Sequence, residues 1–139
     1  MPIKPENRSR YPANWKDIRA AILERAGNCC EKCKVANGAR IARGAGIYAD
    51  TFQMNDAEVF DAETGERIAR VRMSEYQVKN MVTIVLTIAH LDHQPENCDP
   101  ANLRALCQLH HLQHDAAHHA ETARATRRAR LAVGDLFEQ

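Results

Sequence analysis

The chain has 139 residues, a formal net charge of +1 and 45% hydrophobic residues, with aromatic residues at 5%. This length fits one domain, and the near-zero net charge excludes a general electrostatic attraction to nucleic acid, so phosphate contacts must come from local patches. Five cysteines, an odd number, exclude a complete disulfide framework.

The cysteines and the apolar segments together indicate a cytoplasmic protein. Two pairs of metal-ligating residues separated by a long insert, the second pair mixed with histidine, fit zinc in a reducing compartment better than a secreted scaffold. The first residues lack the apolar core of a signal peptide. The longest apolar run, residues 81–89, is too short to span a bilayer.

Residues 1–13 form a basic arm punctuated by prolines. Its cationic side chains are candidates for contact with DNA phosphates, and the alternative is an ordinary solvated terminus. These side chains are Lys4, Arg8 and Arg10.

A helix and a tight turn follow the arm. Asn14 is expected to cap a helix over residues 15–26, and Gly27 is expected to end it. The turn carries Cys30 and Cys33, and the two residues between them allow both thiolates to face one ion. Thiol redox pairs have the same spacing, but the strand and helix of a thioredoxin-like site do not surround this turn. The pattern therefore favours zinc.

The middle of the chain gives weaker signals. Residues 35–56 are rich in glycine and weakly periodic, which predicts irregular structure with no more than one short strand. Residues 57–61 and 66–73 alternate around a Glu-Thr-Gly-Glu turn, which predicts a β-hairpin. We interpret the hairpin, over about 57–73, as an insertion between two halves of a metal site and assign no chemistry to it.

Residues 81–89 are rich in Val, Ile and Thr and predict a strand. After a polar loop, Pro100 predicts the start of a helix that runs to about Val133, and residues 134–139 form a tail. The distal part of this helix gathers basic side chains, which form either a solvated face or a contact with the DNA backbone. They are Arg124, Arg127, Arg128 and Arg130.

The second half of the zinc site is expected on that helix. Cys107 and His110 are three residues apart, so they share one face and can reach an ion held by Cys30 and Cys33. Four such ligands without a carboxylate make a closed tetrahedral site, and closed zinc sites are structural. In small zinc modules the ion supplies about 10–16 kcal/mol of apparent folding free energy.

Two alternatives to this register stay open, with Cys29 in place of Cys30 and His114 in place of His110. Cys98 lies in the polar loop and is left over. We interpret it as a bystander.

Four segments together resemble the HNH endonucleases of the zinc-knuckle kind found among bacterial and phage proteins. They read R-A-G-N-C-C-E-K-C, A-H-L-D-H, N-L-R-A-L-C and H-H-L-Q-H-D. The resemblance covers both ends of residues 15–115 but not the hairpin between them. It implies an α+β fold of the ββα-metal type in a single domain over residues 14–133, with a structural zinc knuckle and a long C-terminal helix. It also implies metal-dependent hydrolysis of DNA, by nicking or double-strand cleavage, and as a further partner a phage packaging or other nuclease-recruiting complex.

The resemblance gives roles to three residues. His90 would be the general base, Asn102 would orient His90 or its loop, and His111 would bind a catalytic Mg²⁺, Mn²⁺ or Ni²⁺. Phosphodiester hydrolysis needs an attacking water, a proton acceptor and a cation that stabilises the developing charge. A neutral imidazole suits the acceptor role at cellular pH.

The chain departs from the family at one position. Family members commonly carry an Asp or His metal ligand directly before the base, and here that residue is Ala89. Asp92 would share the face of His90 on a continuing strand and could replace the ligand, or it could cap the loop instead. His93 is a second candidate for the missing ligand.

Structural interpretations stand beside these roles. His90 is alternatively a buried histidine, and Asn102 a residue that opens a helix. Asp115 either pairs with an arginine or hydrogen-bonds a ligand histidine. The remaining histidines of the helix are mainly expected to be solvated, with metal contact as the lesser alternative; they are His114, His118 and His119.

Three classes of function follow from these patterns. The leading one is a metal-dependent DNA endonuclease. The second is a non-catalytic zinc module that binds DNA or protein and has lost a metal ligand at Ala89. The third, a thiol redox protein, requires Cys30 and Cys33 to react with thiol reagents without removal of zinc.

Overall fold

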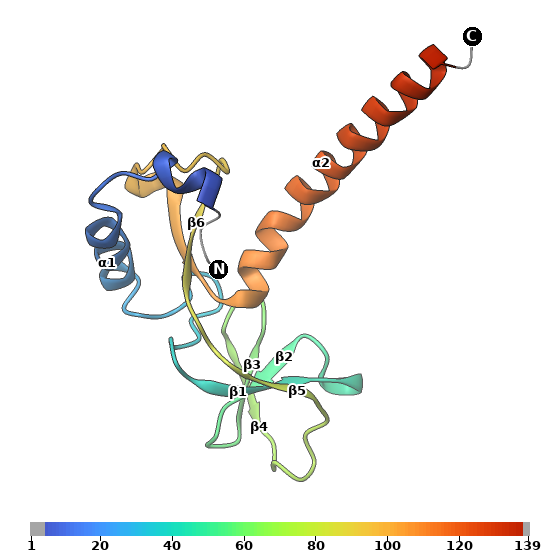
Figure 1. Cartoon of the computed structure of the whole chain (residues 1–139). Helices are drawn as coiled ribbons and strands as arrows, with labels where there is room; N and C mark the ends of the chain where they lie inside the picture. The colour runs from blue at the N-terminus through green and yellow to red at the C-terminus, as the bar shows by residue number, and fades with distance from the viewer. Residues whose placement is uncertain (1–4, 138–139) are drawn as a thin grey trace.

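A computed structural model describes residues 5–137, apart from the side chains of Asn7, Ala117, His119, Thr122 and residues 132–137. The fold is mixed α+β, as expected, with two antiparallel sheets and two α-helices (Figure 1). Helix α1 spans Trp15–Arg25 and helix α2 spans Gln108–Phe137. Lys4, a residue of the expected basic arm, lies outside the described residues.

The larger sheet has five strands in the order β4-β3-β2-β1-β5. The predicted hairpin is confirmed, because β3 and β4 pair antiparallel across the Glu-Thr-Gly-Glu turn. The prediction of irregular structure over residues 35–56 is wrong, since this segment contains β1 and β2, which pair with each other and join the hairpin to β5. Two residue pairs join β1 to β2, three join β2 to β3 and five join β1 to β5, so the stability of these strands comes from sheet partners that local periodicity does not reveal. The strands are β1 (Arg40–Gly44), β2 (Thr51–Gln53), β3 (Glu58–Asp61), β4 (Arg67–Arg70) and β5 (Val78–Thr83).

The strand predicted over residues 81–89 is divided between the two sheets. Strand β5 ends at Thr83, and β6 (Thr87–His90) begins a separate two-stranded sheet. Ile84 and Leu86 between them are fully buried, whereas Met81 and Val85 are exposed, so only part of the apolar run contributes to the core and it does not form one strand. The expected end of the strand at His90 is confirmed.

The helix predicted from Pro100 begins later. Residues 100–102 form a short 3-10 helix, and Leu103–Leu106 form β7, which pairs antiparallel with β6. Leu103 and Ala105 are fully buried against Ile22 of α1, and this period-2 burial is what makes the segment a strand. The order is therefore a hairpin of β6 and β7 followed by α2.

Helix α1 follows the prediction closely, with Ile22 buried and Gly27 at a φ of +66° just after its end. Asn14 is at the N-cap position, as predicted, but its side chain makes no capping hydrogen bond. The arm ahead of it forms a 3-10 helix over Pro5–Arg10. Arg10 pairs with Glu96 in the loop between β6 and β7, which pins the arm to the body of the protein.

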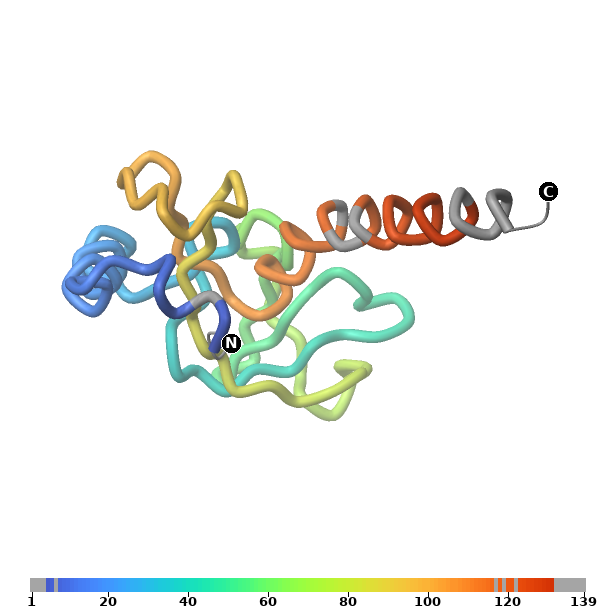
Figure 2. The backbone as a smooth tube through the Cα atoms, turned by 45° about the horizontal axis from the view of Figure 1, so that its top comes forward, coloured from blue at the N-terminus to red at the C-terminus, as the bar shows by residue number. Residues whose placement is uncertain are grey.

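Helix α2 continues through Gly134 to Phe137, so the expected stop before Gly134 is wrong. Its first turns pack on β6 and β7, and the rest extends away from the body (Figures 1 and 2). No helix within residues 5–137 combines the length and the apolar character needed to cross a membrane.

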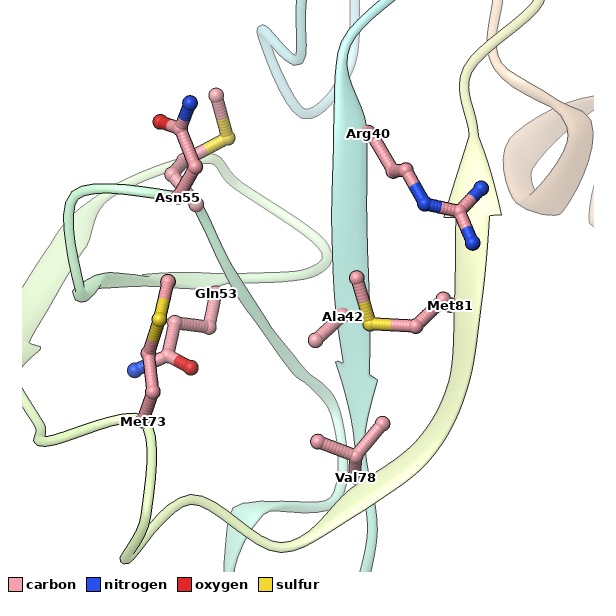
Figure 3. Close-up of a pocket in the computed structure, with 8 residues that line it drawn as sticks. Arg40, Ala42, Gln53, Asn55, Met73, Val78 and Met81 are labelled. Atoms are coloured by element: carbon pink, nitrogen blue, oxygen red, sulfur yellow. The ribbon is translucent and has the colours of Figure 1, made fainter.

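A pocket of about 410 Å³ lies on one face of the five-stranded sheet. Ala42 of β1 and Met81 of β5 line it beside Met73 (Figure 3). None of the cysteines or histidines whose side chains the structure describes lines this pocket.

Candidate metal centres

Three cysteines and one histidine meet at a buried point between the knuckle and the start of α2. Cys30, Cys33, Cys107 and His110 each offer a ligand atom, and these atoms all lie within 4.8 Å of one another. Cys30 and Cys33 come from the turn after α1, which an isolated β-bridge between Cys29 and Ala36 closes. Cys107 directly precedes α2, and His110 lies in its first turn.

The spacing of the ligand atoms fits a tetrahedral zinc site. With Zn–S bonds of about 2.3 Å and Zn–N bonds of about 2.0 Å, tetrahedral ligand atoms stand roughly 3.5–3.8 Å apart. The sulfur atoms of Cys33 and Cys107 are 3.8 Å apart, and Nδ1 of His110 lies 3.6 Å from Cys30 Sγ and 3.3 Å from Cys107 Sγ. The four residues are at most 2% exposed, so water cannot take a coordination position. The cluster can therefore hold a structural zinc ion, as the sequence predicts.

The sulfur and nitrogen atoms of this cluster share their protons unevenly. Hydrogen bonds from Cys107 and Cys33 lower the pKa of the Cys30 thiol. Burial acts to lower the pKa of His110, but its hydrogen bonds to Cys107 and Cys30 outweigh burial and raise this pKa to about 9. A proton stays on the imidazole next to thiolate sulfur until a cation displaces it.

The other cysteines take no part in the cluster. The thiol of Cys29 points to the carbonyl oxygen of Gly27 at 3.4 Å. Cys98 contacts the carbonyl of Pro95 at 3.3 Å and packs beside α1. His114, the alternative to His110, lies against His93 instead.

The two faces of β6 point in different directions. Thr87 and Ala89 face α2, where the Thr87 hydroxyl hydrogen-bonds Nδ1 of His111. Ile88 and His90 face α1, and the ring of His90 stacks on Trp15 with centroids 5.2 Å apart. Because side chains alternate along a strand, His90 and His111 lie on opposite faces of the β6–β7 hairpin.

His90 therefore has the surroundings of a core residue. It is 8% exposed, Tyr11 covers its edge at 5.8 Å, and burial lowers the pKa of its imidazole. The expectation that His90 and His111 work on one cation conflicts with this packing.

Asp92 is bound inside the loop that follows β6. The strand ends at His90 and the chain turns, so Asp92 does not continue the face of His90. Its carboxylate accepts hydrogen bonds from Asn97, Asn102 and the backbone of Gln94 at 2.8–2.9 Å. Hydrogen bonds from Asn97 and Asn102 lower the pKa of Asp92 to about 2. Asp92 thus has the contacts of the loop-capping alternative, not those of a metal ligand.

Asn102 has the contacts of a loop-holding residue. Its amide donates to Asp92 and to the carbonyl oxygen of Asn97, both at 2.9 Å, and its own oxygen accepts from the backbone of Asp92 at 3.2 Å. These bonds tie both ends of the loop between β6 and β7 together. Any part of Asn102 in catalysis stays a prediction.

A second group of potential ligands lies where this loop meets α2. His93, His114 and Asp115 each offer an atom, and the three atoms lie within 4.8 Å of one another. His93 adopts a φ of +58°, which turns its ring back toward the helix. There it stacks between His114 and His118, with centroid distances of 4.6 and 4.1 Å. We use the name histidine cluster for the five residues His93, His111, His114, Asp115 and His118.

Asp115 is the acidic centre of the histidine cluster. One of its oxygens lies 3.5 Å from Nδ1 of His93, and the other lies 3.3 Å from Nε2 of His111. His114 donates its Nε2–H to the carbonyl oxygen of His90 at 3.2 Å, which leaves Nδ1 for another partner. Burial lowers the pKa of His111.

The sequence patterns missed the ligand potential of this cluster in part. The sequence patterns indicate His93 only as a second candidate ligand, His114 as an alternative zinc ligand, and Asp115 as a partner of an arginine or of a ligand histidine. The spacing of His111, His114, Asp115 and His118, at i, i+3, i+4 and i+7, was the available signal, because such residues share one helix face. What that face meets depends on the turn at His93, which the spacing does not specify.

The expected phosphate contacts are separate from the clusters. Side chains 123–131 of α2 are all exposed, and they include Arg124, Arg127, Arg128 and Arg130. Arg10 of the N-terminal arm is engaged by Glu96 and Gln94. Arg8 is exposed.

No protein-family model, curated protein or solved structure matches this chain. The resemblance to HNH endonucleases therefore rests on the motifs of the chain alone.

Proposed function

We propose that the protein is a metal-dependent endonuclease that hydrolyses DNA phosphodiester bonds, with its catalytic cation at the histidine cluster. One observation carries this proposal: the loop after β6 brings His93 against His114 and Asp115 at the start of α2. Strand β6, the loop with Asn102, strand β7 and helix α2 follow one another in the order of a ββα-metal core. The closed Cys3His centre lies at the start of the same helix and would bind the structural zinc.

In this proposal Asp115, His93 and His114 hold the catalytic cation. A divalent cation bound there would act as a Lewis acid and stabilise negative charge on the scissile phosphate and the leaving oxygen. Histidine and carboxylate ligands suit Mn²⁺ and Ni²⁺, and Mg²⁺ is served by Asp115 and water. A half-buried group with oxygen and nitrogen ligands leaves positions for water and phosphate, unlike the closed sulfur-rich centre.

The neighbouring residues hold these ligands in place. His111, fixed by the Thr87 hydroxyl, lies against the second oxygen of Asp115 and orients the carboxylate. The carbonyl oxygen of His90 fixes the ring of His114. His118 is exposed beside His93, and we assign it the role of proton acceptor for the attacking water.

This assignment moves the catalytic histidine within the A-H-L-D-H motif. The motif contains two histidines, and the packing of His90 on Trp15 makes His93 the one that faces the helix. With His93 as a ligand, the lack of a metal ligand at Ala89 does not count against the proposal, because the residue directly before His90 is no longer needed to bind the cation.

The arginines of α2 are proposed to bind the DNA backbone. From Asp115 to Arg127 the helix rises by about 18 Å, at roughly 1.5 Å per residue. One strand of B-DNA rises about 3.4 Å per nucleotide, so this length spans about five base pairs. The exposed arginines can therefore hold a duplex at a short distance from the cut.

A second candidate function is a zinc module that binds DNA without cutting it. The buried position of His90 and the loop-capping role of Asp92 favour it, because two of the residues expected in catalysis have structural contacts. The two candidates differ in one respect, which is whether the histidine cluster turns over substrate.

A plasmid-nicking assay separates them. Supercoiled DNA is incubated with wild type, His93→Ala and His90→Phe in the presence of Mg²⁺, Mn²⁺ or Ni²⁺. We expect nicking by wild type and by His90→Phe, whose ring keeps the stack on Trp15, and loss of nicking in His93→Ala. The reverse pattern would return the general base to His90. Absence of nicking by all three proteins, with DNA binding retained, would establish the binding module.

A further inference from the structure

The turn between β3 and β4 rests directly on the cysteine knuckle. Gly65, with a φ of +76°, lies so close that a Cβ atom there would stand 2.2 Å from the carbonyl oxygen of Cys33. Ala62 is buried in the same apolar cluster as the three zinc-site cysteines. The five-stranded sheet is therefore docked on the Cys3His centre through this turn, although some forty residues separate it in sequence from Cys107.

Glu63 in this turn faces the outer edge of His110. Nδ1 of His110 lies among the cysteine sulfurs, and its Nε2 points the other way, where Oε2 of Glu63 is 3.9 Å distant. Nε2 is buried and has no hydrogen-bond partner among the described residues. Lys32 at 3.2 Å and Gln113 at 3.3 Å hold the Glu63 carboxylate in position.

Arg43 of β1 lies on the sulfur side of the same centre. Its Nη2 is 3.9 Å from Cys107 Sγ, and its guanidinium lies over the ring of Phe52. The other terminal nitrogen, Nη1, is buried without a hydrogen-bond partner in the part of the chain that the structure describes. Three thiolates and Zn²⁺ carry a net charge of −1, and a buried guanidinium offsets it.

We propose that Glu63 and Arg43 are positioning residues of the zinc centre, so that the inserted sheet controls how tightly zinc is held. With zinc on Nδ1 of His110 the proton would be on Nε2, and Glu63 would accept it in a hydrogen bond that fixes the ring once the 3.9 Å between Nε2 and Oε2 shortens. Arg43 stabilises the thiolate of Cys107. The inference needs zinc at the Cys3His centre but does not need nuclease activity.

The first test measures zinc affinity by competition with a chromophoric chelator. Glu63→Gln is expected to weaken zinc binding about 10-fold, at the lower end of the effect of outer-shell partners. Glu66→Gln, which removes an acid from the same turn, is the matched control and should leave the affinity unchanged. Glu63→Asp keeps the charge and should recover part of the loss. Equal affinities in wild type and Glu63→Gln would overturn the role of Glu63.

The second test reads the sulfur environment in the Co²⁺-substituted protein. Arg43→Met removes the cation at similar length and is expected to shift the sulfur-to-cobalt charge-transfer bands and to weaken zinc binding. Arg43→Lys should restore most of both, which separates a charge effect from misfolding. Arg70→Met on β4 is the control.

Unchanged bands and affinity in Arg43→Met would refute the role of Arg43. A wild-type protein that binds no zinc would refute the whole inference. A wild type that binds zinc and shows these shifts without nicking DNA would sink the nuclease proposal alone.

Discussion

The Cys3His centre and the histidine cluster both include residues from the first turns of α2. They differ in exposure and in ligand type, which decide what a bound metal can do. The Cys3His centre is at most 2% exposed and has three sulfurs and one nitrogen. The histidine cluster is half-buried and offers imidazoles and a carboxylate. His110 and His111 are neighbours in sequence, but one faces the knuckle and the other faces Asp115. A rotation of about 100° along the helix therefore separates a closed cluster that could hold a structural ion from one that can admit water.

Because of this difference, substitution of a ligand should have different consequences in the two centres. Loss of a closed centre removes folding free energy, whereas loss of an open centre leaves the fold and removes chemistry. The following experiments test that contrast, from the largest expected effect to the smallest.

Removal of one sulfur from the closed centre should have the largest effect. Cys107→Ser is expected to abolish bound zinc and the cooperative thermal unfolding transition, because a structural zinc supplies about 10 kcal/mol or more in small modules. Metal analysis and circular dichroism measure the two effects. Cys29→Ser, beside Cys30 but outside the cluster, should behave as wild type. A cooperative, zinc-free Cys107→Ser protein would contradict a structural role for the metal.

Substitution of Asp115 should remove chemistry without loss of fold. Asp115→Asn is expected to reduce nicking by about 100-fold or more, the scale seen when one group that stabilises the transition state is lost. Zinc content and melting temperature should stay near wild type. Glu121→Gln, on the exposed part of the same helix, is the control. A large fall in melting temperature would instead indicate that Asp115 is mainly a structural partner of His111.

The arginines of α2 should change DNA binding but not metal content. Each lost phosphate contact lowers the slope of log K against log salt by about 0.9, so Arg127→Gln with Arg128→Gln should lower it by about 2. Fluorescence anisotropy with a DNA duplex, at salt concentrations from about 50 to 200 mM, measures this slope. Arg70→Gln with Arg72→Gln removes the same charge at the end of β4 in the five-stranded sheet and just beyond it. Equal slopes in the two double variants would exclude the helix as the DNA contact.

The burial of His90 should give a small dependence of stability on pH. Its pKa in the folded protein is lowered by burial, so between that value and about 6.5 the unfolded chain binds more protons. The free energy of unfolding should therefore decrease as the pH falls through 6.5. His90→Phe should flatten this part of the pH profile in denaturant titrations of the zinc-loaded protein. An identical profile in the variant would mean that His90 is accessible and titrates normally.

The sequence by itself indicated the Cys3His cluster, with Cys29 and His114 left open as alternative members, and it predicted the hairpin and α1. In each case the information is local: two cysteines on one turn, Cys107 and His110 at helical spacing, and alternation on both sides of a turn. Because the members of each pair are close in sequence, these patterns depend little on the rest of the chain. The candidate ligands could therefore be named before the fold was known.

Tertiary structure decided which histidine of A-H-L-D-H meets the helix. The motif leaves open whether the strand continues past His90, and both histidines satisfy the pattern. Pairing of Leu103–Leu106 with β6 turned an expected helix into a strand, and it set the face on which His90 packs against Trp15. A shift of one residue along a strand moves a side chain to the opposite face, so no count of spacings could replace the observed register.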